Sequence, residues 1–137
     1  MANGGSFEGK TLLSPEAWEE LHSAPTIDKC TLFNIHTCMT KGGLGKFGVD
    51  QFSQEQQTFQ LKRHNTGRDG FFGWFGYGGS VMQWNPELKI GFAYVPAEFN
   101  VVDLLNEKGA LIQDIVLKCA KGEEIKKEEA GKTCVVF

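Results

Sequence analysis

The residues from Gly70 to Pro96 constrain the fold of this chain most, because glycine and aromatic residues are both concentrated there. Four glycines, at positions 73, 76, 78 and 79, alternate with five aromatic residues between Phe71 and Tyr77. Glycine at this density lets the backbone take a positive φ or approach other groups closely. The aromatic side chains bury a large area on whatever covers them. We therefore predict two strands that are entered through a glycine-rich bend.

The two strands are expected to form a hairpin. Residues 80–84 have the composition of a strand, residues 85–87 are Asn-Pro-Glu and typical of a turn, and residues 89–95 alternate in character. In the second strand one face carries Ile90, Phe92 and Tyr94, and the other carries Gly91, Ala93 and Val95. Because the second face is small, we expect a helix to lie close against it.

The spacing of apolar residues after Pro96 predicts a helix over residues 101–120, with Gly122 as its stop signal. Asn100 or Asp103 is expected to cap its start. The apolar stripe of this helix is predicted to cover the face formed by residues 91, 93 and 95. Residues 123–137 mix lysine and glutamate, which is typical of a charged, flexible tail.

The first half of the chain has weaker signals. Ser14, Pro15 and Glu16 predict the start of a short helix that ends before Pro25. Residues 1–10 are expected to be a helix end that turns into a loop, and residues 30–35 are expected to be a strand. Residues 51–63 are compatible with a helix or an exposed loop, and residues 64–70 form a turn cluster.

Composition indicates one ordinary globular domain. The chain has 137 residues, of which 41% are apolar and 23% charged. Its formal net charge is −3 and its basic residues are scattered, so we expect no nucleic-acid partner. The cysteines at 30, 38, 119 and 134 have neither CxxC nor metal-site spacing, and no secretory leader precedes them. We therefore expect free thiols, no metal or other cofactor, and a cytoplasmic location.

Residues 72–80 (FGWFGYGGS), the Asn-Pro-Glu turn and the Ile-Gly-Phe-Ala-Tyr-Val strand together carry a resemblance to a known family. They resemble the carboxy-terminal part of the beta-lactamase-related serine hydrolases, which include class C beta-lactamases, penicillin-binding proteins and esterases. The third motif of that family is Lys-Thr-Gly, His-x-Gly or Trp-x-Gly on an inner strand, and Trp74-Phe75-Gly76 is similar to it. The resemblance implies an α+β fold in which residues 1–122 supply only the last third or so of the family domain, an antiparallel sheet with packed helices.

The resemblance also implies a binding site at this strand. Trp74, Phe75, Gly76 and Tyr77 would contact a substrate, and the backbone N–H of Tyr77 would donate to an oxyanion. Because tryptophan cannot hold a carboxylate as lysine does, a neutral ester-like or peptide-like ligand is favoured over a beta-lactam. The alternative is that these aromatic side chains are simply part of the core of an inner strand.

Two of the three family motifs are absent. A serine hydroxyl needs a neighbouring base, which the family supplies in a Ser-x-x-Lys motif. The serines at 6, 14, 23, 53 and 80 are followed three positions later by Gly, Ala, Thr, Gln and Gln, and neither tyrosine begins a Tyr-x-Asn motif. We therefore expect a truncated or fragmentary member that is inactive on its own. The alternatives are a non-catalytic binding or interaction protein that retains the pocket wall, and a tail-anchored scaffold.

Without the helix that carries Ser-x-x-Lys in the family, one face of the 89–95 strand would stay uncovered, which predicts marginal stability or self-association. Other groups give weaker signals. Ser80 lacks the Gly-x-Ser-x-Gly context, Cys38 is expected to be a buried thiol rather than the partner of His36, and His64 is expected to be exposed. Residues 134–137 (CVVF) match a prenylation signal at Cys134, which would give weak membrane association, with chance as the rival explanation.

Overall fold

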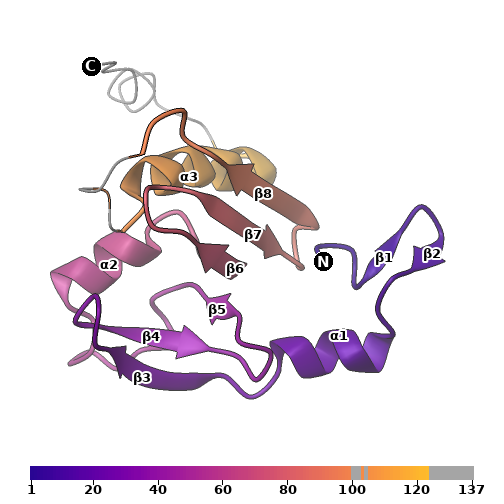
Figure 1. Ribbon diagram of the computed structural model, residues 1–137, viewed down its shortest axis with the longest axis horizontal. Helices are drawn as coiled ribbons and strands as arrows, with labels where there is room; N and C mark the ends of the chain where they lie inside the picture. Colours follow the sequence, from indigo (N-terminus) through magenta and orange to yellow (C-terminus); the bar gives the residue numbers. More distant parts are fainter. Residues whose placement is uncertain (100–102, 104, 124–137) are drawn as a thin grey trace.

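The computed structural model describes residues 1–99, 103 and 105–123. Within these residues it has three α-helices, a six-stranded antiparallel sheet and a separate two-stranded sheet (Figure 1). The predicted α+β class with an antiparallel sheet and packed helices is therefore confirmed, and the beta-lactamase fold itself stays a prediction. The predicted 123–137 tail lies almost wholly outside the described residues.

The large sheet follows the order of the chain, so each strand pairs with the one before it. Its strands are β3 (Thr26–Cys30), β4 (Ile35–Met39), β5 (Gly45–Lys46), β6 (Phe72–Phe75), β7 (Val81–Asn85) and β8 (Ile90–Tyr94). A long connection between β5 and β6 contains α2 (Phe59–Asn65). This helix overlaps the end of the stretch 51–63, for which the sequence allowed a helix or a loop, and extends to Asn65. Thr58 caps it by accepting a hydrogen bond from the N–H of Leu61 at 3.2 Å.

The predicted glycine bend and hairpin are confirmed at β6, β7 and β8. The N–H of Gly76 donates to the carbonyl of Ser80 at 2.7 Å and closes the bend between β6 and β7. Gly78 has a φ of +95°, and a Cβ there would lie 2.4 Å from the ring of Phe99, so only glycine is accommodated. At the next turn the side-chain oxygen of Asn85 accepts from the N–H of Leu88 at 3.0 Å.

The carboxy-terminal helix α3 (Glu107–Lys121) begins later than the sequence predicts. Asp103 still serves as a cap, because its carboxylate accepts from the N–H of Glu107 at 2.6 Å. Asn106 occupies the N-cap position, and its side-chain amide donates instead to the carbonyl of Gly76 at 3.0 Å. The predicted stop at Gly122 is confirmed, since this residue takes a left-handed conformation with a φ of +71°.

Helix α3 covers the face of the sheet opposite to the predicted one. Leu117 packs into a cluster that includes Ile90 and Phe92. Gly109 lies so close to the sheet that a Cβ there would be 2.8 Å from Val81. The prediction was wrong because it weighed only the close approach that small residues permit. The large side chains of the other face bury far more apolar area under the helix.

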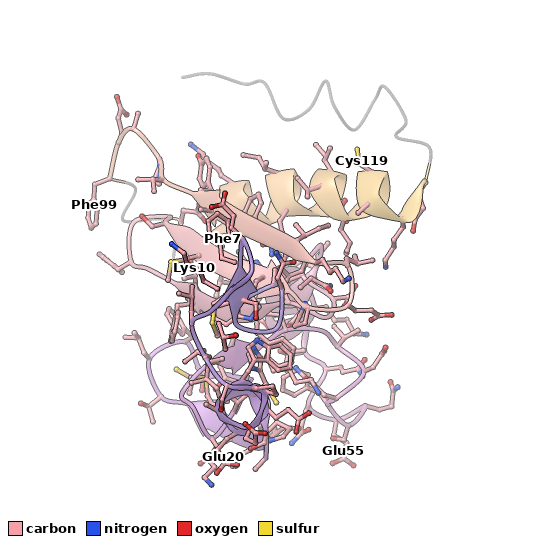
Figure 2. All side chains as sticks on the ribbon, turned by 90° about the vertical axis from the view of Figure 1, so that its right-hand side faces the viewer. Phe7, Lys10, Glu20, Glu55, Phe99 and Cys119 are labelled. Atoms are coloured by element: carbon pink, nitrogen blue, oxygen red, sulfur yellow. The ribbon has the colours of Figure 1, made fainter. Side chains whose placement is uncertain are left out.

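Residues 1–22 form what we call the amino-terminal arm, which contains β1 (Ser6–Phe7), β2 (Lys10–Thr11) and α1 (Pro15–His22). In Figure 1 it projects at the right of the sheet, and Figure 2 shows its hairpin, labelled at Phe7 and Lys10, standing in front of the sheet. The predicted cap is confirmed, because Ser14 accepts from the N–H of Ala17 at 3.2 Å. Residues 1–10 are a turn and a hairpin rather than the end of a helix.

The strand predicted at residues 30–35 is wrong. Cys30 ends β3, Ile35 begins β4, and the four residues between them form the turn of a hairpin. Asn34 takes a left-handed conformation with a φ of +55°, and its N–H donates to the carbonyl of Cys30 at 2.8 Å. Threonine and phenylalanine in this stretch have the composition of a strand, but asparagine tolerates the left-handed conformation that the turn requires.

Candidate functional site

Strands β6, β7 and β8 each present side-chain positions on the face of the sheet that α3 does not cover. We call the six positions on these strands the open face. In the register of the strands, Trp74, Met82 and Ala93 lie side by side, and so do Phe72, Trp84 and Gly91. The side chain of Met82 is 56% exposed and that of Trp74 is 44% exposed. A Cβ placed on Gly91 would meet no atom within 4 Å. This side of the sheet therefore has free space next to large apolar side chains.

A hollow of about 660 Å³ lies between the open face and the arm. Its walls include Trp74, Met82, Trp84, Gly91 and Ala93 from the sheet, and Met1, Phe7, Leu12, Leu13 and Leu21 from the arm. The remaining lining residues are also uncharged. Asn3 and Ser6 are polar, whereas the side chain of Gln83, whose strand position also borders the hollow, is directed to the other face of the sheet and accepts from Gln113. The hollow thus has the size and the mostly apolar lining of a small-molecule site.

The two tryptophans in the hollow have their polar atoms occupied by the protein. The indole N–H of Trp74 donates to the carbonyl of Gly43 at 3.0 Å, and that of Trp84 donates to Nε2 of His22 at 2.9 Å. The two rings meet edge to face with their centroids 5.8 Å apart. Their ring surfaces, and not their N–H groups, are therefore what a guest in the hollow would meet.

His22 connects the arm to the sheet. Its Nδ1–H donates to the carbonyl of Trp18 at 2.7 Å, while its Nε2 accepts from the indole N–H of Trp84 at 2.9 Å, so the two bonds fix the orientation of the ring. The ring also stacks on Trp18 with centroids 4.1 Å apart and meets the edge of Phe72 at 4.9 Å. Both nitrogens of this histidine are engaged, and the aromatic cluster explains why Trp84 is buried on a face that is otherwise open.

The structure separates the four residues predicted to contact a substrate. Trp74 lines the hollow, whereas Phe75 points to the covered face, because successive side chains on a strand alternate. Gly76 belongs to the turn that follows. Tyr77 is 62% exposed, meets the ring of Phe99 at 5.3 Å and does not line the hollow. The role of the Tyr77 N–H as an oxyanion donor stays a prediction.

A buried histidine and arginine lie beneath the covered face, and sequence reasoning missed both. His64, predicted to be exposed, is 3% exposed, and Arg68 is fully buried. The guanidinium donates to the carbonyls of His64 at 3.0 Å and Asn106 at 2.9 Å, and lies 5.6 Å from the ring centre of Phe47. It joins the end of α2 to the start of α3. The spacing of four residues between His64 and Arg68 was the available signal, but the surrounding turn residues indicated an exposed loop.

Burial sets the ionisation of these groups. Desolvation and the neighbouring Arg68 cation lower the pKa of His64 to about 3, so its imidazole is neutral at physiological pH. Desolvation lowers the pKa of Arg68 to about 10, which leaves it charged. The thiol of Cys38 is buried as predicted, and burial raises its pKa. A cavity of about 40 Å³ beside Cys38 and His64 has room for water-sized guests only.

Comparisons with protein-family models, with curated proteins and with solved structures find no match to this chain. In the part of the chain that the structure describes, His, Cys, Asp and Glu side chains form no group of three or more suited to a metal ion. No helix within the described residues is long and apolar enough to cross a membrane. The prenylation predicted at Cys134 falls outside the described residues.

Proposed function

We propose that this protein is a non-catalytic relative of the beta-lactamase-related serine hydrolases that binds a ligand in the hollow on its open face. The observation that carries the proposal is the position of Trp74. This residue, the first of the Trp-x-Gly motif, lines a hollow large enough for a small molecule but bounded by uncharged side chains. Such a site offers shape and apolar contact, and none of its lining side chains is a base that could activate a nucleophile.

The serines near the arm support binding rather than hydrolysis. Ser14 accepts the first-turn hydrogen bond of α1, and the hydroxyl of Ser23 donates to the carbonyl of Glu20 at 2.9 Å. Ser6 lines the hollow, but His22, which accepts a hydrogen bond from the lining residue Trp84, has both ring nitrogens engaged. A serine hydroxyl without a base is a poor nucleophile.

A second candidate function is that of a partial serine hydrolase, in which further sequence would supply the nucleophile. The exposure of Met82 and Trp74 favours it, because large apolar residues on a sheet face are usually covered by another layer. In that case the hollow would be filled by protein instead of by a ligand. Both candidates predict that residues 1–137 do not turn over an ester.

The test uses p-nitrophenyl butyrate, a neutral ester, with residues 1–137. We expect saturable quenching of tryptophan fluorescence, no release of nitrophenol above the buffer rate, and no labelling by a fluorophosphonate probe. Trp74→Ala should weaken binding at least tenfold. Leu32→Ala is the matched control, because Leu32 is 78% exposed at the distant β3–β4 turn. Saturable turnover with labelling of one serine would contradict the proposal, and so would unchanged binding by Trp74→Ala.

A further inference from the structure

The hollow also carries information about the kind of ligand it would hold, an inference that rests on the proposed function. Its lining has no charged side chain, and both indole N–H groups in it already donate to protein atoms. A charged group held against these walls would lose water without gaining a partner, which is costly. The polar side chains at its edge, Asn3 and Ser6, suit at most a hydroxyl or carbonyl on the ligand.

The amino-terminal arm forms the outer wall of the hollow and is attached to the rest of the protein at the carboxyl end of α1. The carbonyl of Leu21 accepts from the hydroxyl of Thr40 at 2.8 Å and from the N–H of Gly42 at 3.2 Å, and His22 bonds to Trp84. These bonds hold the carboxyl end of α1, whereas none of the residues of α1 is buried. The indole of Trp18 donates to the carbonyl of Met1 at 2.9 Å and ties the start of the chain to this helix. The arm is therefore held to the rest of the protein at the carboxyl end of α1.

The hairpin end of the arm presents apolar side chains that are poorly covered. Phe7 is 60% exposed and Leu12 is 70% exposed, yet both line the hollow. Figure 2 shows this hairpin in front of the sheet. An apolar ligand in the hollow would cover these side chains and Met82, and would remove their apolar surface from water.

We propose that the hollow is a binding site for a neutral, largely apolar small molecule, which is held between the tryptophans of the open face and the arm. The lining side chains are all uncharged, which disfavours ionised ligands. The indole faces of Trp74 and Trp84 favour flat ring systems, since aromatic rings pack edge to face or with an offset. Closure of the arm over the guest buries Phe7 and Leu12.

The experiment compares three probes with the same ring and different charge: 2-acetylnaphthalene, 2-naphthoate and naphthalen-2-ylmethylammonium. Binding to residues 1–137 is measured by tryptophan fluorescence and by ligand-observed NMR. We expect the neutral ketone to bind at least ten times more tightly than either ion. Affinities that do not depend on the charge would overturn the proposed ligand class.

Variants that fill the hollow locate the site. Gly91→Leu places a side chain in free space, and Gly91 lies outside the left-handed region, so the fold should tolerate the change. Ala93→Leu fills the same space from the neighbouring position. Both should weaken binding of 2-acetylnaphthalene at least tenfold. Val95→Leu is the matched control, because Val95 is 77% exposed just beyond β8 and does not line the hollow. Wild-type affinity in both filled variants would overturn the proposal.

Three further outcomes separate this inference from its rivals. If p-nitrophenyl butyrate binds without turnover but no naphthalene probe binds, the ligand class is wrong and the proposed function stands. If turnover with serine labelling is seen, the proposed function itself fails. If analytical ultracentrifugation shows a dimer that Gly91→Leu dissociates, a second copy of the chain occupies the open face and the small-molecule site is overturned.

Discussion

The two faces of the six-stranded sheet differ in what lies against them. The covered face carries Val81, Gln83 and Phe92 under α3, and the side-chain amide of Gln113 donates to that of Gln83 at 2.8 Å inside the interface. The open face carries Trp74, Met82 and Gly91 beside a hollow. Strands β6, β7 and β8 contribute side chains to both faces. The difference between the faces therefore arises from the side chains that alternate along these strands.

This difference indicates what determines the face of the sheet that α3 covers. Two glycines matter here. Gly109 on α3 lets the helix approach Val81, whereas a Cβ on Gly91 of the open face would meet no atom within 4 Å. The small residue that permits close packing is thus on the helix, and the large residues are on the strand. The face with small strand residues keeps free volume, which is the requirement for a ligand site.

The largest expected effect is the difference in lost stability when a large side chain is truncated on the covered side or on the open face. Phe71 is fully buried in the cluster with Leu117, so Phe71→Ala should lower the free energy of unfolding by about 3–5 kcal/mol. Met82→Ala, on the open face, should lower it by less than about 1 kcal/mol, because most of that side chain is already in water. Urea unfolding measures both changes. Equal losses would show that the open face is covered in solution.

A smaller effect concerns pH and the buried histidine of the covered side. The pKa of His64 is about 3 in the folded protein against 6.5 for an ordinary histidine. The unfolded chain therefore binds the extra proton first as the pH falls. The contribution of His64 to stability is complete above pH 6.5 and is lost toward pH 3, at up to about 1.4 kcal/mol per pH unit.

The control for this pH dependence is His64→Gln, which removes the titrating group. Urea unfolding at several pH values between 7 and 4 should give a shallower decline for the variant than for the natural chain. The comparison also cancels the contribution of carboxylates such as Asp69, whose pKa burial raises. Parallel declines for the two proteins would show that His64 is exposed enough to protonate in the folded state.

The smallest expected effect concerns the histidine of the open side. His22→Phe keeps the ring contacts with Trp18 and Phe72 but loses the hydrogen bonds to the Trp18 carbonyl and the Trp84 indole. We expect a loss of about 1 kcal/mol, and faster hydrogen exchange at the Trp84 indole N–H in NMR spectra. His36→Phe, on strand β4, serves as the control. Unchanged exchange at Trp84 would show that His22 does not hold the arm.

The parts of the fold that local rules govern could be predicted from the sequence. Ser14 and Pro15 start α1, the glycines after Phe75 make the bend, and Gly122 ends α3, because each depends on the conformational range or hydrogen bonding of a few neighbouring residues. The turn at Asn34 was missed because its β-forming neighbours conceal a single left-handed residue. In the candidate site, the sequence pointed to Trp74 but grouped it with Phe75 and Tyr77, which the structure places elsewhere.

The burial of His64 and Arg68 could not be predicted in this way. Both lie in a polar turn cluster, and polar clusters between periodic segments are usually exposed loops. Here the carbonyls at the end of α2 and before α3 need donors, and the guanidinium of Arg68 supplies them. That need exists only once the two helices lie side by side.

The sequence by itself determined where the β7–β8 hairpin, the glycine bend, the start of α1 and the end of α3 lie, since strand alternation, glycine conformation and capping act over a few residues. Only the tertiary structure decided which face of the sheet α3 covers, and hence where the hollow lies. Both faces of β8 are uncharged in sequence, so alternation alone does not distinguish them. The choice depends on the total area that α3, Phe47 and Phe71 bury together, and these residues come from segments far apart in the chain.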